Sequence, residues 1–266
     1  MIRTKKLAIS IPLSLMAILF SLNLEAYSFT SDYQKGFYWR AFPVAIKRFA
    51  TNTTDANFLQ TLADQAVEEW EDAVGQDIWD LSSVVQSTSY SGNYIRWSDN
   101  FGAETGYDPS STLAVTIRYN RGTFFESVVI ILNGNISYLR QNWGNSLKTT
   151  LLHEIGHTVG LDHSSYTNAI MYPSLGSVTT LQTDDIQGMS ALVSDTQRKQ
   201  QTGYVSPYSA SGDSKKLLPA CGTIEDQNSG GSGGSSSGNF VFALVLGLGL
   251  STLLKARNIK SKIRID

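Results

Sequence analysis

Three histidines and one glutamate have the types and spacing that chemistry at a metal ion requires. His153, Glu154, His157 and His163 stand in the segment HEIGHTVGLDH, and the chain has no other histidine. On a helix, side chains four residues apart lie on one face. His153 and His157 can therefore direct two ring nitrogens at one zinc ion at about 2.1 Å.

The residues around this pair predict how a third ligand would arrive. Apolar side chains occupy the other side of the same helix and predict its core-facing surface: Leu147, Leu151, Ile155 and Val159. Gly160 tolerates a positive φ, so it can end the helix and reverse the chain. This reversal would deliver His163 as the third ligand. Glu154 lies beside the two imidazoles, where it can contact a water on the metal without displacing a ligand.

The full pattern H-E-x-x-H-x-x-G-x-x-H resembles that of the metzincin metalloproteases. Ser164 directly after the third histidine, and the segment Ala169–Pro173 (AIMYP), are similar to the matrixin branch. The resemblance implies an α+β fold with a twisted, mixed five-stranded sheet and three helices. It also implies that Met171 forms a structural Met-turn beneath the zinc. Tyr172, Pro173 and Thr149 would line the S1′ pocket.

The resemblance also implies a mechanism and a place for the substrate. Three imidazoles leave zinc a fourth position for water, whose pKa falls to about 7. Glu154 would take a proton as that zinc-bound water attacks a peptide carbonyl, and then pass it to the leaving amine. We expect the peptide to pair antiparallel with Phe125–Leu132, which is similar to the matrixin edge strand.

Strands and helices alternate irregularly along the body of the chain, residues 27–193, which on its own predicts an α+β or α/β class. One helix begins near Asp55 and ends at Gly75, a second begins at Asn145 or Ser146, and a third covers Thr183–Val193. The strands predicted from β-branched and aromatic runs are Val44–Phe49, Tyr94–Trp97, Leu113–Tyr119 and Phe125–Leu132.

The composition of the two ends of the chain is typical of targeting segments. Residues 1–26 have the charged start and apolar stretch of a signal peptide, with an N-terminal membrane anchor as the alternative. Residues 194–239 form a linker or stalk that ends in a Gly/Ser run. An apolar segment, 240–254, and a basic tail, 255–266, follow.

The order of these C-terminal parts resembles that of bacterial C-terminal sorting signals. The Gly-Gly run is similar to the type cut by rhomboid-like sortases, and Leu218–Gly222 (LPACG) is similar to a sortase site with Cys221 in place of threonine. A single-pass tail anchor is the alternative. In each case the hydrophobic segment would attach the chain to a membrane or cell envelope.

Composition excludes some partners and leaves others open. Without its two ends the chain keeps 13 basic against 21 acidic residues, which argues against nucleic acid. The single cysteine, Cys221, excludes a disulfide framework and follows the catalytic segment, so no cysteine switch precedes it. Asp32 is a candidate latency group. Calcium is a further possible ion without a placed site, although Asp99, Glu104 and Asp108 offer oxygens.

Three functions fit these observations. The leading one is a monomeric, exported zinc-dependent endopeptidase, secreted or held at the envelope, with proteins or peptides as substrates. A non-catalytic, zinc-containing adhesion or binding module is the alternative from another class. A narrow processing peptidase that acts on one surface partner is the third. The intact Glu154 favours an enzyme, because a structural zinc site has no use for a base.

Overall fold

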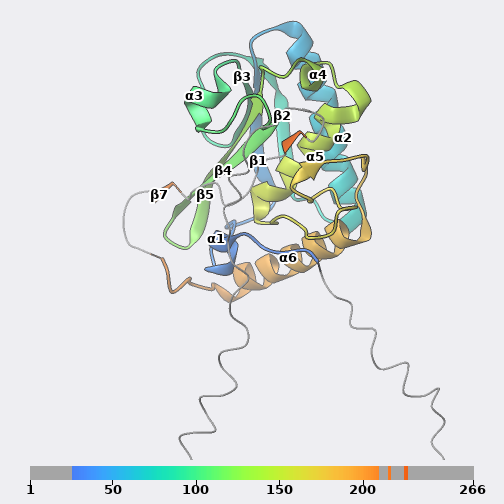
Figure 1. Cartoon of the computed structure of the whole chain (residues 1–266). Coiled ribbons are helices and arrows are strands. Elements are labelled where there is room, and N and C mark those ends of the chain that lie inside the picture. Colours follow the sequence, from blue (N-terminus) through green and yellow to red (C-terminus); the bar gives the residue numbers. More distant parts are fainter. Residues whose placement is uncertain (1–25, 210–214, 217–224, 227–266) are drawn as a thin grey trace, which may run out of the picture. The chain divides into compact units, whose positions relative to one another are not determined.

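A mixed sheet with two long helices on one face organises the domain (Figure 1). The computed structural model describes residues 26–209, 215–216 and 225–226. Its helices are α1 (Ser31–Gln34), α2 (Thr53–Val74), α3 (Phe101–Thr105), α4 (Ser137–Arg140), α5 (Ser146–Val159) and α6 (Thr183–Thr202), with a 3-10 turn at Trp143–Asn145. Its strands are β1 (Val44–Ala50), β2 (Trp79–Gln86), β3 (Tyr94–Ser98), β4 (Ala114–Arg121), β5 (Phe124–Asn133), β6 (Ser174–Leu175), β7 (Lys215–Lys216) and β8 (Glu225–Asp226).

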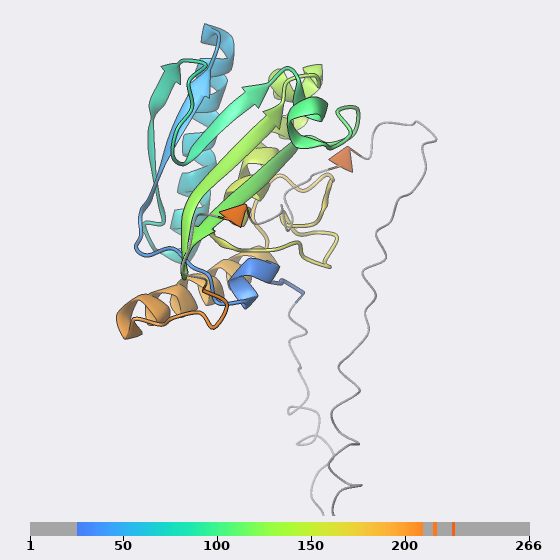
Figure 2. The same cartoon turned by 90° about the vertical axis from the view of Figure 1, so that its left-hand side faces the viewer.

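The main sheet has the strand order β2-β1-β3-β5-β4-β7. β1 pairs parallel with β2 and β3, β3 pairs parallel with β5, and β4 is antiparallel to β5. Strands β1 to β5 confirm the mixed five-stranded sheet, and the three long helices α2, α5 and α6 accompany it. β7 adds two residues to the outer edge of β4 (Figure 2).

The strand expected at the edge of the sheet is an interior strand, so that expectation is wrong. β5 lies between β3 and β4, and β4 is the strand next to the edge. The physical reason is visible in the run Val128–Leu132, in which every side chain is buried. A strand covered on both faces reads as a continuous apolar run and belongs inside a sheet.

Helix α2 packs its apolar stripe against α5. Its N-cap is Asn52, whose side chain accepts a hydrogen bond from the Asp55 N–H at 2.9 Å, so Asp55 lies inside the first turn. Gly75 ends the helix with φ of 67°. The Trp70 indole donates to the Leu152 carbonyl of α5 at 2.9 Å, which fixes the two helices relative to each other.

Helix α5 is buried on nearly every side. The side-chain oxygen of Asn142 accepts from the N–H groups of Leu147 and Lys148 at 3.0 and 3.2 Å. The N-cap position of α5 is Asn145, one of the two predicted starts, but its side chain makes no capping hydrogen bond, and the side chain of Asn142 supplies this bond instead. The predicted apolar face is confirmed, but every residue of α5 except Lys148 is buried. A histidine-bearing face inside the protein needs partners for its polar atoms.

Helix α6 continues to Thr202, nine residues beyond the predicted end at Val193. The added turns are polar in sequence, which concealed their packing. Lys199 is only 6% exposed, and its ammonium lies 3.9 Å from the centre of the Tyr33 ring and 2.9 Å from the Asp195 carboxylate. Cation–π and ionic contacts thus replace apolar burial at this end of the helix.

The predicted targeting segments lie almost entirely outside the described residues. These are the signal peptide 1–26 except Ala26, the Gly/Ser run, the apolar segment 240–254 and the basic tail 255–266. Within the described ranges, no helix has the length and hydrophobicity needed to cross a bilayer.

Candidate metal centre and catalytic site

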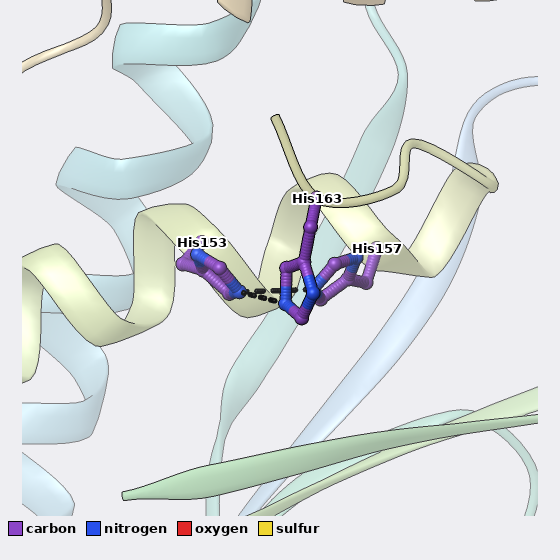
Figure 3. A group of neighbouring side chains, drawn as sticks. All are labelled: His153, His157 and His163. Atoms are coloured by element: carbon purple, nitrogen blue, oxygen red, sulfur yellow. Dashed lines mark hydrogen bonds between the residues drawn. The ribbon is translucent and has the colours of Figure 1, made fainter. Parts of the chain in front are cut away.

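The three histidines converge on one point (Figure 3). His153 Nε2 lies 2.9 Å from His157 Nε2 and 3.2 Å from His163 Nε2. Nitrogens bound at about 2.1 Å to one tetrahedral zinc lie about 3.4 Å apart. The observed spacings are a few tenths of an ångström shorter. Among the described residues, this is the one group of three ligand side chains that converges in this way.

Hydrogen bonds at Nδ1 of His153 and His157 determine which ring nitrogen can bind a metal. His153 Nδ1 donates to the Ile170 carbonyl at 2.8 Å, and His157 Nδ1 donates to the Leu161 carbonyl at 2.7 Å. A carbonyl only accepts, so Nδ1 carries the proton and Nε2 keeps a lone pair. Two lone pairs 2.9 Å apart repel unless a cation lies between them. The residues therefore fit a divalent metal ion.

The environment keeps the imidazoles neutral, as metal ligands must be. Burial lowers the pKa of His153 and His157 well below 6.5, and neighbouring imidazoles lower it further. Burial also lowers the pKa of His163 to about 4, against the opposing charge of Asp162. No proton has to leave these rings near neutral pH.

The N-terminal segment holds His163 in place. Gly160 takes φ of 113°, which confirms the predicted reversal of the chain after α5. Two backbone hydrogen bonds hold the chain after this reversal. The Thr30 N–H donates to the Gly160 carbonyl at 2.9 Å, and the Asp162 N–H donates to the Ser28 carbonyl at 2.8 Å. The Ser28 hydroxyl donates to the carbonyl of His163 itself at 2.9 Å.

A tight turn lies beneath the histidines, and Asp185 anchors it. The two carboxylate oxygens of Asp185 accept from the N–H groups of Ile170 and Met171, each at 2.9 Å. Met171 is 1% exposed and packs on α5 at Gly156, where an added Cβ would lie 2.7 Å from its sulfur. Met171 therefore packs against the helix that carries His153 and His157, and its role as a Met-turn stays a prediction.

Glu154 directly follows His153 in α5 and is buried, and one of its two carboxylate oxygens accepts a hydrogen bond. Its Oε2 accepts a hydrogen bond from the Thr116 hydroxyl of β4 at 2.5 Å. Its Oε1 is buried and has no hydrogen-bond partner among the described residues. Burial raises the pKa of Glu154 well above its usual value, against the hydrogen bond from Thr116 and the charge of Arg118. A carboxylate in this state can take up a proton.

Asp32 forms a buried ion pair with Arg118. Its carboxylate pairs with Arg118 Nε at 2.7 Å, and the two side chains are 2% and 1% exposed. Arg118 also donates through Nη1 to the carbonyl of His157, at the end of α5. The ion pair therefore links α1 to β4 and α5, and Asp32 does not belong to the converging ligand group.

The predicted pocket residues divide into two that line one pocket and one that does not. Thr149 and Tyr172 line a small pocket with Leu175 of β6, and Pro173 is not among its lining residues. Thr149 also borders a larger cavity of about 810 Å³ beside Tyr138 and Trp143. The hydroxyl of Thr149 is buried without a partner among the described residues, so it can bond a ligand in either cavity.

The acids considered for calcium are bonded to other groups. Asp99 pairs with Arg140, and Glu104 pairs with Arg96 at 2.5 Å. Asp108 accepts from the N–H of Ser110 at 2.8 Å. No three of these oxygens form a ligand group within the described ranges.

Sequence reasoning missed three residues of this site: Thr116, Asp185 and Arg118. Thr116 and Arg118 lie two residues apart in a predicted strand, which places them on one face, and a charged residue in an apolar strand is a sign of a buried partner. Asp185 lies in the first turn of α6, where an acid is favoured by the helix dipole alone, so its sequence position gives no sign of the contact with the turn at Ile170 and Met171.

A three-histidine metal site with a buried glutamate, on a helix packed against a mixed sheet, defines the class of the zinc-dependent peptidases. The sequence profile of the matrixin family (Peptidase_M10) matches residues 45–194, more than half of the chain. The chain therefore belongs to the matrixin family, and the expected metzincin fold is confirmed.

Individual relatives match shorter stretches. The chain is 42% identical over 59 residues to a macrophage metalloelastase of Oryctolagus cuniculus, which covers 19% of this chain and 13% of that protein. It is 44% identical over 61 residues to a putative matrix metalloproteinase of Spodoptera frugiperda ascovirus 1a, covering 21% and 16%. With interstitial collagenase A of Mus musculus it shares 36% identity over 92 residues, covering 31% and 20%. The chain thus spans a fifth or less of the length of these relatives.

Proposed function

We propose that this protein is a zinc-dependent endopeptidase in which His153, His157 and His163 bind the ion through Nε2 and Glu154 is the general base. One observation carries the proposal most directly. The Oε1 atom of Glu154 is buried without a hydrogen-bond partner among the described residues, and Glu154 directly follows His153, one of the three converging histidines. A buried oxygen without a partner costs free energy, so it indicates a group that acts on a ligand.

The residues divide the work of peptide hydrolysis. The zinc ion, when bound, acidifies water and polarises the carbonyl of the scissile bond. Glu154 accepts the proton of the attacking water at Oε1 and later gives it to the leaving amine. Thr116 holds Oε2, which fixes the carboxylate plane during both transfers. The Nδ1 hydrogen bonds of His153 and His157 keep both rings from rotating.

The edge of β4 is the place where a peptide substrate would pair. A strand edge offers unpaired N–H and C=O groups to an extended peptide. Thr116 lies on this strand and contacts Glu154, so a peptide bound along β4 would pass close to the base. Thr149 and Tyr172 would line the pocket for the side chain after the scissile bond.

A non-catalytic, zinc-containing surface module is the second candidate. It accounts for the three histidines, since structural zinc sites use the same ligand type. It does not account for Glu154, whose Oε1 atom is buried without a partner among the described residues. A substitution at Glu154 therefore separates the two functions.

The deciding experiment compares Glu154→Gln with wild type. We expect casein cleavage to fall by a factor of about 10² or more, because general-base catalysis contributes that much. Zinc content, measured by atomic absorption, should stay near one ion per chain in both proteins. The exposed Glu68 of α2 provides the matched control, and Glu68→Gln should cleave at the wild-type rate. Equal cleavage by wild type and Glu154→Gln would refute the mechanism.

We also propose, from sequence pattern alone, that residues 1–26 export the chain and that it acts as a monomer outside the cytoplasm. Residues 240–266 would then attach it to the membrane or envelope. Fractionation of cells that express the full chain, with and without residues 240–266, tests this proposal. Peptidase antigen that stays in the cytoplasm in both cases would contradict it.

A further inference from the structure

The outer edge of β4 is already partly covered by the chain itself. β7 pairs antiparallel with β4, with Lys216 opposite Tyr119 and Lys215 opposite Asn120. β7 is therefore the sixth strand of the sheet, and it extends the sheet in the way an added peptide would (Figure 1). The rest of the outer edge, Ala114–Arg118, pairs with no strand among the described residues.

A second pairing lies on the other side of the proposed cleft. β6 directly follows the Met-turn, and its Leu175 lines both pockets near Thr149. β8 pairs parallel with β6, with Glu225 opposite Ser174 and Asp226 opposite Leu175. Two stretches that flank the proposed catalytic centre thus each bind a backbone segment from the same part of the chain.

The direction of these pairings matches that of a bound peptide. β7 runs antiparallel to β4, and β8, which comes later in the sequence, pairs with β6. Substrate pairing with a matrixin edge strand is expected to have this same antiparallel direction. Tyr119, the partner of Lys216, lies on the same strand as Thr116, the residue that contacts Glu154.

We propose that β7 and β8, the described residues Lys215–Lys216 and Glu225–Asp226, occupy the peptide-binding surface formed by β4 and β6 and compete there with substrates. This inference rests on the proposed function, since the surface matters for activity only if the chain is a peptidase. Backbone hydrogen bonds of this kind form with almost any peptide sequence. A substrate peptide present in excess can therefore take the place of β7 and β8. Covalent attachment gives β7 and β8 an effective concentration in the millimolar range, which makes even weak pairing effective.

The test uses the full chain with a proline in β7, because proline has no N–H to donate to β4. Lys216→Pro removes the N–H and blocks a ladder position of β7. Ser237→Pro, in the Gly/Ser run, is the matched control. Hydrogen exchange of the peptide that covers Ala114–Arg121 is measured in both variants on the Glu154→Gln background, so that no chain is cut. We expect faster exchange of these amides in Lys216→Pro, and exchange unchanged from the parent in Ser237→Pro.

Kinetics supply the second measurement. On a fluorogenic peptide, Lys216→Pro should lower KM by about tenfold with kcat unchanged, and Ser237→Pro should change neither. A synthetic peptide of residues 213–228, added to Lys216→Pro, should raise KM again as a competitive inhibitor. Cleavage of this peptide by the enzyme would also place it in the cleft and support the proposal.

The two measurements separate failure of this inference from failure of the proposed function. If amide hydrogen exchange of Ala114–Arg121 is unchanged in Lys216→Pro, β7 does not occupy the edge of β4, whatever the peptidase activity of the variant. An unchanged KM overturns the competition with substrate. Faster exchange in a chain that cleaves no peptide at all would leave the occupancy standing and remove the peptidase function instead.

Discussion

The Thr116 hydroxyl donates to Oε2 of Glu154 at 2.5 Å, and it also lies 3.2 Å from the Glu154 carbonyl. This contact joins β4 to α5, the helix that carries the proposed base. It fixes one carboxylate oxygen, while the other, Oε1, has no hydrogen-bond partner among the described residues. Both residues are fully buried, so no water substitutes for the hydroxyl.

Thr116→Val should therefore lower kcat by about 10- to 100-fold, because a carboxylate displaced by up to about 1 Å loses that much rate. KM should change little, since Thr116 acts on Glu154 and the substrate backbone pairs with the strand. Thr116→Ser keeps the hydroxyl and should restore most of kcat. Steady-state kinetics on one peptide substrate, with zinc content as a control, measures all three proteins. Equal kcat for the valine and serine variants would contradict the positioning role.

The three-histidine cluster could be predicted because its residues lie close together in the sequence. The i, i+4 spacing of His153 and His157, and Gly160 before His163, depend on helix geometry and one reversal. These elements span eleven residues of sequence, and the structure brings the same three side chains together. The mixed sheet and long helices followed from the resemblance that these residues carry.

The supporting contacts were not predictable, because they join distant positions. Thr116 and Glu154 are 38 residues apart, and Arg118 and Asp32 are 86 apart. No periodicity within a strand or helix specifies such a pair. The edge strand was misassigned although a signal existed. The continuous apolar run Val128–Leu132 indicates burial on both faces, and hence an interior strand.

Removal of the metal should destabilise the domain as well as inactivate it. Without an ion, the lone pairs on the Nε2 atoms of His153 and His157 face each other at 2.9 Å inside the protein. A ligand that binds only the folded state stabilises it, by about 4 kcal/mol at a thousandfold excess over its dissociation constant. Dialysis against a chelator should lower the melting temperature, and zinc should restore it. An unchanged melting temperature would argue against a metal in this site.

Gly156→Ala tests the packing of the Met-turn on α5. Alanine alone would favour a helix by about 1 kcal/mol over glycine. The new Cβ would, however, lie 2.7 Å from the Met171 sulfur and 3.2 Å from the Trp70 ring. Overpacking costs about 1–3 kcal/mol, so we expect a net loss in the free energy of unfolding. Urea denaturation measures it, and Gly176→Ala, with open space around its Cα, is the control. A gain in stability in Gly156→Ala would show that Met171 moves aside freely.

The Asp32–Arg118 pair gives the fold a defined sensitivity to acid. Burial alone would raise the pKa of Asp32, but the charge and hydrogen bonds of Arg118 outweigh it and hold the pKa below 3.8. The folded chain therefore binds fewer protons at this site than the unfolded chain. The stabilisation is complete above about pH 3.8 and is lost as the pH falls through the lower, folded value.

Asp32→Asn should remove this stabilisation and leave Arg118 buried without a counter-ion. Loss of one partner of a buried pair costs about 3–5 kcal/mol, so the free energy of unfolding at pH 7 should fall by about that amount. Below pH 3.8 the difference between the variant and wild type should shrink, because the unfolded wild-type chain then takes up a proton at Asp32 that the folded chain does not bind. Urea denaturation at pH 7 and pH 3 measures both values. A difference that stays constant between the two pH values would mean that Asp32 contributes by packing, and that its charge contributes nothing.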